Sequence, residues 1–164
     1  MKILFLDMDG VINSSNFARR YYKKYHKGIG GFEFFDPNKV KLVNKICIKT
    51  DCKIVWSSTW RNYFSDLDKC KQCFDNVGLL SDRLIGCTPC FFSGWSQGGR
   101  HSRGGEIRSW ISGTEYNLDK CAVLDDGSDA GEFLPTNCKF FQTTNTYGLT
   151  KRITDQVIDY LGEK

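Results

Sequence analysis

Histidine is scarce in this chain of 164 residues, and long apolar runs are absent. Its two histidines, His26 and His101, belong to no HExxH pattern, so we expect both to be exposed loop residues rather than metal ligands. No stretch approaches the roughly 18 consecutive apolar residues that a membrane-spanning helix needs. Because no charged and apolar leader precedes the first strand pattern, we expect a soluble, cytoplasmic protein.

The usual glycine-rich phosphate motifs are also missing. The glycines of residues 86–100, GCTPCFFSGWSQGGR, fit neither GxGxxG nor GxxxxGK followed by Ser or Thr. This stretch therefore indicates neither a dinucleotide site nor a P-loop. A net charge of +4 suits phosphate-bearing partners without identifying them.

Cysteine, by contrast, is frequent, with eight residues in the chain. Four of them form two CxxC pairs, Cys70 with Cys73 and Cys87 with Cys90. This spacing resembles that of zinc-ribbon ligands. The first pair falls in a predicted helix, where the same spacing places small apolar residues on one packed face. Buried thiols are the interpretation we favour, with structural zinc and disulfides as the alternatives.

An apolar run at the beginning of the chain stops abruptly at two acids. Residues 3–6 are apolar on both faces and too few for a helix, so they predict a buried parallel strand. Because side chains alternate along an extended segment, we expect Asp7 and Asp9 to project to the same side at its carboxyl end. Open α/β sheets bind their ligands at this edge.

The same pattern of an apolar run followed by polar residues occurs twice more. Residues 54–56 lead to Ser57 and Ser58, and residues 121–124 lead to Asp125 and Asp126. Helix patterns separate these runs, and a fourth strand is predicted at residues 139–142. The order predicts an α/β fold with one Rossmann-like domain over residues 1–164, a parallel central sheet and helices on both faces.

Four carboxylates would then share one edge of the sheet, those of Asp7, Asp9, Asp125 and Asp126. Like charges at close range raise each other's pKa and destabilise the fold unless a cation neutralises them. Oxygen ligands without a nearby histidine or cysteine are typical of Mg²⁺. The sequence therefore predicts a magnesium site.

Hydroxyl groups follow the second strand. Ser57 holds the same place after its strand as Asp7 holds after the first, which favours a functional role. Ser58 is a second candidate for phosphate binding, although it is equally well explained as a turn or helix-cap residue. Arg61 could bind phosphate or be structural, and the sequence does not separate these alternatives.

A cation is expected near the start of the helix predicted at residues 102–113. Arg103 falls in its first turn, where a positive charge opposes the helix dipole. Such an unfavourable placement indicates contact with an anion. We expect Arg103 to make that contact, with Arg100 as the substitute and a solvated surface charge as the alternative.

Two stretches interrupt the α/β pattern. Residues 14–35 contain five basic residues and no acidic one between Ser14 and Phe32, interleaved with aromatic side chains. They form either a solvated surface helix packed through those aromatics or a basic aromatic flap, a cap insertion that attracts phosphates and stacks bases. Residues 62–101 predict an irregular insertion with one helix around residues 66–74.

These motifs resemble those of the haloacid dehalogenase (HAD) superfamily. The resemblance lies in DMDGV at residues 7–11, the strand ending in Ser57, a basic residue before the third strand, and VLDD at residues 123–126. Five motifs are similar, more narrowly, to the HAD domains of RNA-repair proteins: FDPNKV, IVWSSTWR, TP at residues 88–89, RGGEIRSW and LDDGSDA. A small or minimal cap is implied.

The resemblance also implies a role for each site residue. Asp7 would attack phosphorus to form an aspartyl-phosphate, and Asp9 would act as general acid and base. Ser57 and Arg103 would bind the phosphoryl group. Mg²⁺ would be held by Asp7, the backbone carbonyl of Asp9 and Asp125, with help from Asp126.

The expected function is magnesium-dependent hydrolysis of a phosphomonoester, with RNA or DNA ends as the leading substrate. A small cap leaves the cleft open to large substrates. The alternatives are a small-metabolite or nucleotide phosphatase, a protein phosphatase, and a non-catalytic module that binds RNA or protein.

Overall fold

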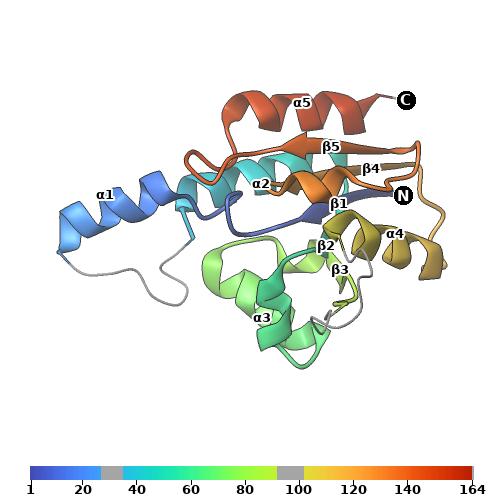
Figure 1. Cartoon of the computed structure of the whole chain (residues 1–164), viewed down its shortest axis with the longest axis horizontal. Coiled ribbons are helices and arrows are strands. Elements are labelled where there is room, and N and C mark those ends of the chain that lie inside the picture. The colour runs from blue at the N-terminus through green and yellow to red at the C-terminus, as the bar shows by residue number, and fades with distance from the viewer. Residues whose placement is uncertain (27–34, 92–101, 164) are drawn as a thin grey trace.

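A five-stranded parallel sheet forms the centre of the computed structural model, which describes residues 1–26, 35–91 and 102–163. The strand order is β3-β2-β1-β4-β5 (Figure 1). The strands are β1 (Lys2–Leu6), β2 (Lys53–Trp56), β3 (Leu84–Cys87), β4 (Lys120–Asp125) and β5 (Cys138–Gln142). The predicted α/β fold with a parallel central sheet is confirmed.

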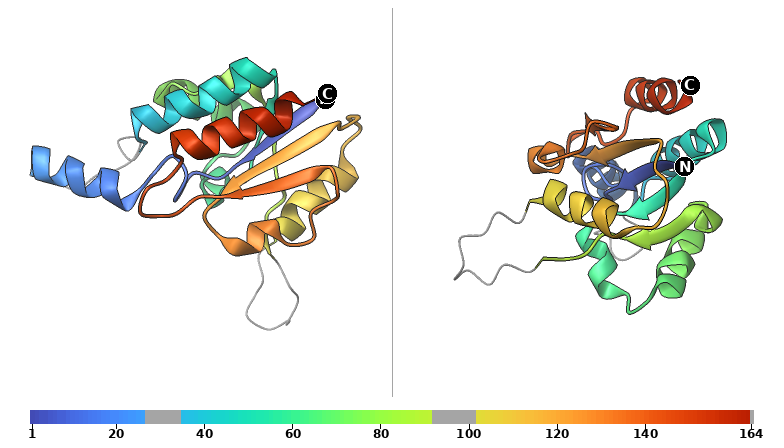
Figure 2. Two further views of the ribbon diagram at one scale, coloured as in Figure 1. Left: turned by 90° about the horizontal axis from the view of Figure 1, so that it is seen from above. Right: turned by 90° about the vertical axis from the view of Figure 1, so that its right-hand side faces the viewer.

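Helices cover both faces of the sheet, as predicted (Figure 2). The larger core cluster joins one sheet face to α2 (Pro37–Thr50), α3 (Leu67–Val77) and α5 (Lys151–Gly162). The smaller cluster joins the opposite face to α4 (Arg103–Gly113). Within β1, Leu4 and Leu6 belong to the first cluster while Ile3 and Phe5 belong to the second, so both faces of this strand are buried.

Side chains at the first turns explain where these helices begin. The Asp36 carboxylate accepts a hydrogen bond from Asn38 N, and Pro37 fits the first helical position of α2. The hydroxyls of Ser102 and Thr150 cap α4 and α5 in the same way. The helix predicted at residues 102–113 is confirmed as α4.

Backbone hydrogen bonds continue one residue beyond the strands and tie their carboxyl ends together. Asp7 N donates to Leu124 O at 3.0 Å, and Ser57 N donates to Leu6 O at 2.8 Å. Thr88 N donates to Trp56 O at 3.0 Å. This row of bonds holds the residues that follow β1, β2 and β3 side by side.

Residues 62–101 are more regular than the sequence predicts. They contain α3 and also β3, which pairs with β2 and completes one edge of the sheet. β3 was not predicted because it has only four residues, LIGC, and three of them are only partly buried. Residues 92–101, with His101 and Arg100, lie outside the described residues.

The first part of the basic aromatic stretch is a helix, α1 (Ser15–Tyr25), which extends away from the body of the molecule (Figure 1). It buries no side chain, and the rings of Phe17, Tyr21 and Tyr25 follow one another along it in tilted contacts. His26 is exposed at its end. Residues 27–34 lie outside the described residues, and a role as a flap stays a prediction.

None of the described helices is long and apolar enough to cross a membrane.

Candidate active site

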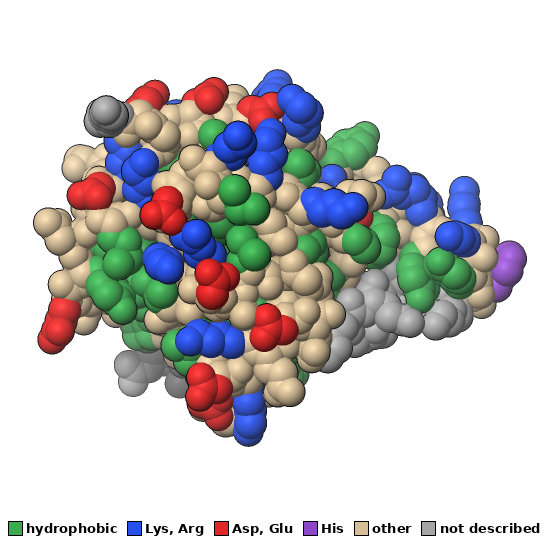
Figure 3. Space-filling view, turned by 180° about the vertical axis from the view of Figure 1, so that it is seen from behind, with side chains coloured by type: hydrophobic (Ala, Val, Ile, Leu, Met, Phe, Trp, Pro, Cys, Tyr) green, Lys and Arg blue, Asp and Glu red, His purple; other side chains and the backbone are tan. Residues whose placement is uncertain are grey.

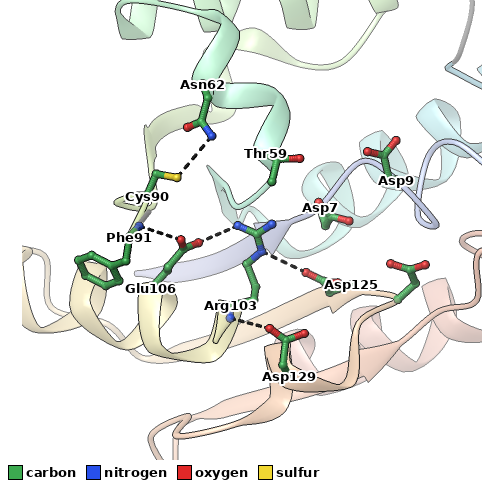
Figure 4. A pocket seen from close by; sticks show the side chains of 11 residues that line it. Asp7, Asp9, Thr59, Asn62, Cys90, Phe91, Arg103, Glu106, Asp125 and Asp129 are labelled. Carbon is green, nitrogen blue, oxygen red and sulfur yellow. Dashed lines mark hydrogen bonds and ion pairs between the residues drawn. The ribbon is translucent and has the colours of Figure 1, made fainter. Parts of the chain in front are cut away.

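A cavity of about 430 Å³ opens at the carboxyl ends of β1 and β4 (Figure 4). Most of its lining is polar and acidic. The lining residues are Asp7, Asp9, Thr59, Asn62, Cys90, Phe91, Arg103, Glu106, Asp125, Asp126 and Asp129. The two strand ends that the sequence marks as acidic therefore meet in one cavity, as predicted.

Three carboxylates gather at its base. Asp7, Asp125 and Asp126 each offer an oxygen, and these oxygens lie within 4.8 Å of one another. Asp7 and Asp125 are buried, while Asp126 is partly exposed. Within the described parts of the chain, this is the one group of three or more acidic, histidine or cysteine side chains placed closely enough to hold a metal ion.

Burial and mutual repulsion perturb the titration of this group. Burial, followed by the charge of Asp125, raises the pKa of Asp7 from 3.8 to about 8. Burial also raises the pKa of Asp125 to about 6, although the Gly127 N–H and Arg103 act in the opposite direction. Such a group favours either protons or a bound cation. Hard oxygen donors at this spacing fit a divalent ion such as Mg²⁺.

Arg103 brings a positive charge to the same cluster. It begins α4, and its guanidinium lies between two acids, 2.7 Å from Glu106 and 3.7 Å from Asp125. Its backbone N–H donates to Asp129 at 2.8 Å. The partners of Arg103 are therefore carboxylates of this site, and the phosphate contact expected of it stays a prediction.

The Asp9 side chain stands apart from the three clustered carboxylates, although it lines the same cavity (Figure 4). β1 ends at Leu6, so the strand alternation that predicted a shared side does not extend to Asp9. Asn13 and Trp60 each donate a 2.8 Å hydrogen bond to its carboxylate.

The turn after Asp9 also packs closely. Gly10 has a φ of 67°, and a Cβ at this position would lie 2.2 Å from the carboxyl group of Asp126. Only glycine allows this approach of the loop to the acidic cluster. The metal-binding role expected for the Asp9 backbone carbonyl stays a prediction.

Both serines that follow β2 are buried. The Ser57 hydroxyl has no hydrogen-bond partner within the described residues, and Ser57 is not part of the cavity lining. The Ser58 hydroxyl lies close enough to Asp7 to lower its pKa without making a full hydrogen bond. A buried hydroxyl without a hydrogen-bond partner is costly, so each of these groups lacks an acceptor or donor that a bound group would supply. Thr88, after β3, is a third buried hydroxyl of this kind.

Arg61 has a structural role. Its buried guanidinium donates to the carbonyl oxygens of Ser58, Thr88 and Pro89 and pairs with Glu106 at 2.8 Å. Of the two alternatives for Arg61, phosphate binding and a structural role, these contacts support the structural role. Glu106 itself was not predicted, because its partner Arg61 is 45 positions away.

The cysteines are free thiols in the structure. Cys70 and Cys73 are buried, and the Sγ atoms of Cys70 and Cys87 are 3.8 Å apart. All eight cysteines are described and free, and none belongs to a potential metal-binding group among the described residues. Cys70 and Cys73 join the larger core cluster, which fits the favoured interpretation of buried thiols, and no two cysteines form a disulfide.

Comparison with known proteins identifies one family. The sequence matches the family model for the HAD domain in Swiss Army Knife RNA repair proteins over residues 3–153. This match extends from β1 into the first turn of α5 and includes every residue of the cavity. No curated protein and no solved structure is significantly similar.

Proposed function

The chain belongs to the family of HAD domains in Swiss Army Knife RNA repair proteins, and on this basis we propose that it is a magnesium-dependent phosphomonoester hydrolase. The observation that carries the proposal is the meeting of Asp7, Asp125 and Asp126 within 4.8 Å, with Arg103 beside Asp125. A nucleophilic carboxylate, a metal-binding set and a cation would then serve one phosphoryl group.

The acidic cluster suits a divalent ion in number, charge and donor type. Asp7, Asp125 and Asp126 would hold Mg²⁺, together with the backbone carbonyl of Asp9. When bound, the ion would keep Asp7 ionised and offset the charge of the phosphoryl oxygens. The raised pKa values of Asp7 and Asp125 support the proposal that a cation binds here, because burial makes the charged form of both carboxyl groups unfavourable.

Catalysis would proceed in two displacements at phosphorus. A carboxylate oxygen of Asp7 attacks phosphorus, and the bond to the leaving oxygen breaks as Asp9 donates a proton to that oxygen. Asp9 then takes a proton from water, whose oxygen attacks the aspartyl-phosphate and releases inorganic phosphate and free Asp7. Arg103 and the Ser57 hydroxyl would bind the non-reacting phosphoryl oxygens.

The ends of RNA or DNA are the proposed substrates. The RNA-repair description of the matching family supports a nucleic acid, and so does the basic composition of α1. The proposed organisation is one domain over residues 1–164 with a small cap at residues 14–35. Such a cap would leave the cavity accessible to the end of a long chain.

Hydrolysis of an aryl phosphate tests this proposal. We expect activity with Mg²⁺, loss of activity in excess EDTA, and loss in Asp7→Asn, which keeps the size of the side chain but not its nucleophilic charge. Oligonucleotides with 3′- or 5′-phosphates, mononucleotides and phosphopeptides then define the substrate. Activity of the wild type no greater than that of Asp7→Asn would contradict the proposal.

A further inference from the structure

A second hollow, of about 440 Å³, lies between α1, the beginning of α2 and the beginning of α5. Five of its nine lining residues are cations, Arg19, Arg20, Lys23, Lys39 and Lys151, and none of the nine is acidic. We call this hollow the basic groove. Figure 3 shows lysine and arginine side chains gathered over α1 and around α5. Three elements that are distant in the sequence therefore combine their charge here.

Much of this charge is not neutralised by the protein. Arg20 and Lys151 have acidic neighbours, at 3.6 Å and 2.7 Å. Arg19 and Lys23 form no ion pair with any described residue. The Lys39 ammonium donates to a backbone carbonyl at 2.6 Å. Burial lowers its pKa, Asp36 acts in the opposite direction, and Arg20 adds a smaller lowering effect. A bound polyanion would supply the negative charge that Arg19 and Lys23 lack.

A surface path connects the basic groove to the acidic cavity. A smaller hollow of about 210 Å³ lies between them. It shares Asp9 with the acidic cavity and Ser14 with the basic groove, and Asn13, Ala18 and Asn145 also line it. Apart from Asp9, this connecting hollow has an uncharged lining. One extended ligand could therefore contact both sites.

Aromatic side chains distinguish the kinds of polyanion that could bind. Tyr147 lines the basic groove and is 62% exposed. Two more exposed rings, those of Tyr22 and Tyr25, lie on α1 but are not among the lining residues. Cations that follow a backbone, together with an exposed ring that accepts a stacked base, are typical of sites for single-stranded nucleic acid. An acidic peptide would use the cations but would leave the Tyr147 ring without a stacked base.

We propose that the basic groove binds the phosphodiester backbone of a single-stranded polynucleotide several nucleotides from its reacting end. The strand would continue past Ser14 and Asp9, and its terminal phosphate would enter the acidic cavity. This last step rests on the proposed function, whereas binding to the groove does not. The arrangement selects long substrates, because a mononucleotide in the acidic cavity cannot reach Arg19 or Lys23 as well.

Fluorescence anisotropy with a labelled single-stranded RNA of 12 nucleotides that has no terminal phosphate tests the groove alone. We expect the Arg19→Glu/Lys23→Glu variant to bind this RNA at least about tenfold more weakly than the wild type. Loss of two phosphate contacts should also reduce the slope of log K against log salt by about 1.4. Neither residue is buried, so the variant should fold.

The matched control is Lys49→Glu/Lys69→Glu, which reverses two exposed cations outside the groove. It should bind within about twofold of the wild type. An equal loss in both variants, or binding of polyglutamate as tight as that of the RNA, would overturn the inference. Aryl phosphate hydrolysis is measured in parallel. Groove-dependent binding without hydrolysis would uphold this inference and contradict the proposed function, and hydrolysis without groove-dependent binding would do the reverse.

Discussion

The indole N–H of Trp60 donates a 2.8 Å hydrogen bond to the Oδ2 atom of Asp9, and the Asn13 amide donates to Oδ1 at the same distance. The two donors come from different parts of the chain, the turn after β2 and the loop after β1. Together they fix the orientation of a carboxylate that is exposed at the edge of the cavity. Trp60 is thereby a positioning residue for the proposed general acid.

Trp60→Phe should remove the hydrogen bond and keep a ring against Phe35, which now contacts the indole at 5.3 Å between ring centroids. We expect kcat to fall by about tenfold, a part of the 100-fold or more that general acid catalysis supplies. The loss should be larger for a ribose phosphate than for a nitrophenyl phosphate, because the poorer leaving group needs the proton more. Steady-state kinetics on the two substrates measure this difference. Equal losses would contradict the positioning role.

Arg61→Lys should destabilise the protein. Lysine keeps the charge but cannot reach three carbonyl oxygens and Glu106 at once, so buried acceptors lose their donors. We expect a loss of roughly 2–4 kcal/mol in the free energy of unfolding, as for other broken buried pairs. Urea unfolding measures this loss. Arg108→Lys, an exposed change on α4, is the control and should have almost no effect.

Two adjacent glycines in α4 should respond in opposite ways to alanine. A Cβ at Gly104 would lie 1.9 Å from the backbone oxygen of Glu132, whereas at Gly105 the nearest atom is the Ser102 hydroxyl at 3.6 Å. Gly104→Ala should therefore push α4 away from the segment after β4 and lower Tm by several degrees. Gly105→Ala should leave Tm unchanged or raise it, since alanine favours a helix by up to about 1 kcal/mol. Thermal unfolding of both variants provides the comparison, and a similar decrease in both would contradict it.

The metal-free protein should lose stability as the pH rises. Burial raises the pKa of Asp7 from 3.8 to about 8 and the pKa of Asp125 from 3.8 to about 6. The folded state therefore holds more protons than the unfolded chain between these values, so its extra stability is lost as the pH rises through them. The carboxylates with lowered pKa values, Asp51, Asp66, Asp119 and Asp155, titrate below this range in both states.

Thermal unfolding in EDTA should show a Tm at pH 8 that is at least about 3 °C below that at pH 5, which corresponds to about 1 kcal/mol for a chain of this size. Asp7→Asn should reduce the difference. Because Mg²⁺ competes with protons for the carboxylates, its addition should raise Tm more at pH 8 than at pH 5. A Tm in EDTA that is constant or rises across this range would contradict the expected charge repulsion.

Local signals explain which parts of the molecule could be predicted. The lengths of the apolar runs and the acids that end them were enough to place Asp7 and Asp125 at one sheet edge, because parallel strands present their carboxyl ends together. Asp36 and Thr150 mark helix beginnings through cap chemistry that involves only neighbouring residues.

The other features depend on contacts that no local pattern reveals. β3 is an edge strand of four residues and has too little apolar sequence to be recognised. The partners of Arg61 depend on how β2 and β3 pack against α4. The residues next to Arg61 in the sequence do not predict these partners. The sequence shows the cations of α1, but it does not show that Lys39 and Lys151 lie beside them in the folded protein.

Backbone hydrogen bonds link Asp7, Ser57 and Thr88 to the neighbouring strands and fix the distances between the backbone positions of the site. They set the spacing of the strand ends at the roughly 4.8 Å of β pairing, through atoms that every amino acid other than proline possesses. Side chains at these positions can therefore be substituted without moving the backbone atoms that carry them. The scaffold can therefore accept new chemistry one position at a time, as gradual evolution or stepwise redesign would require.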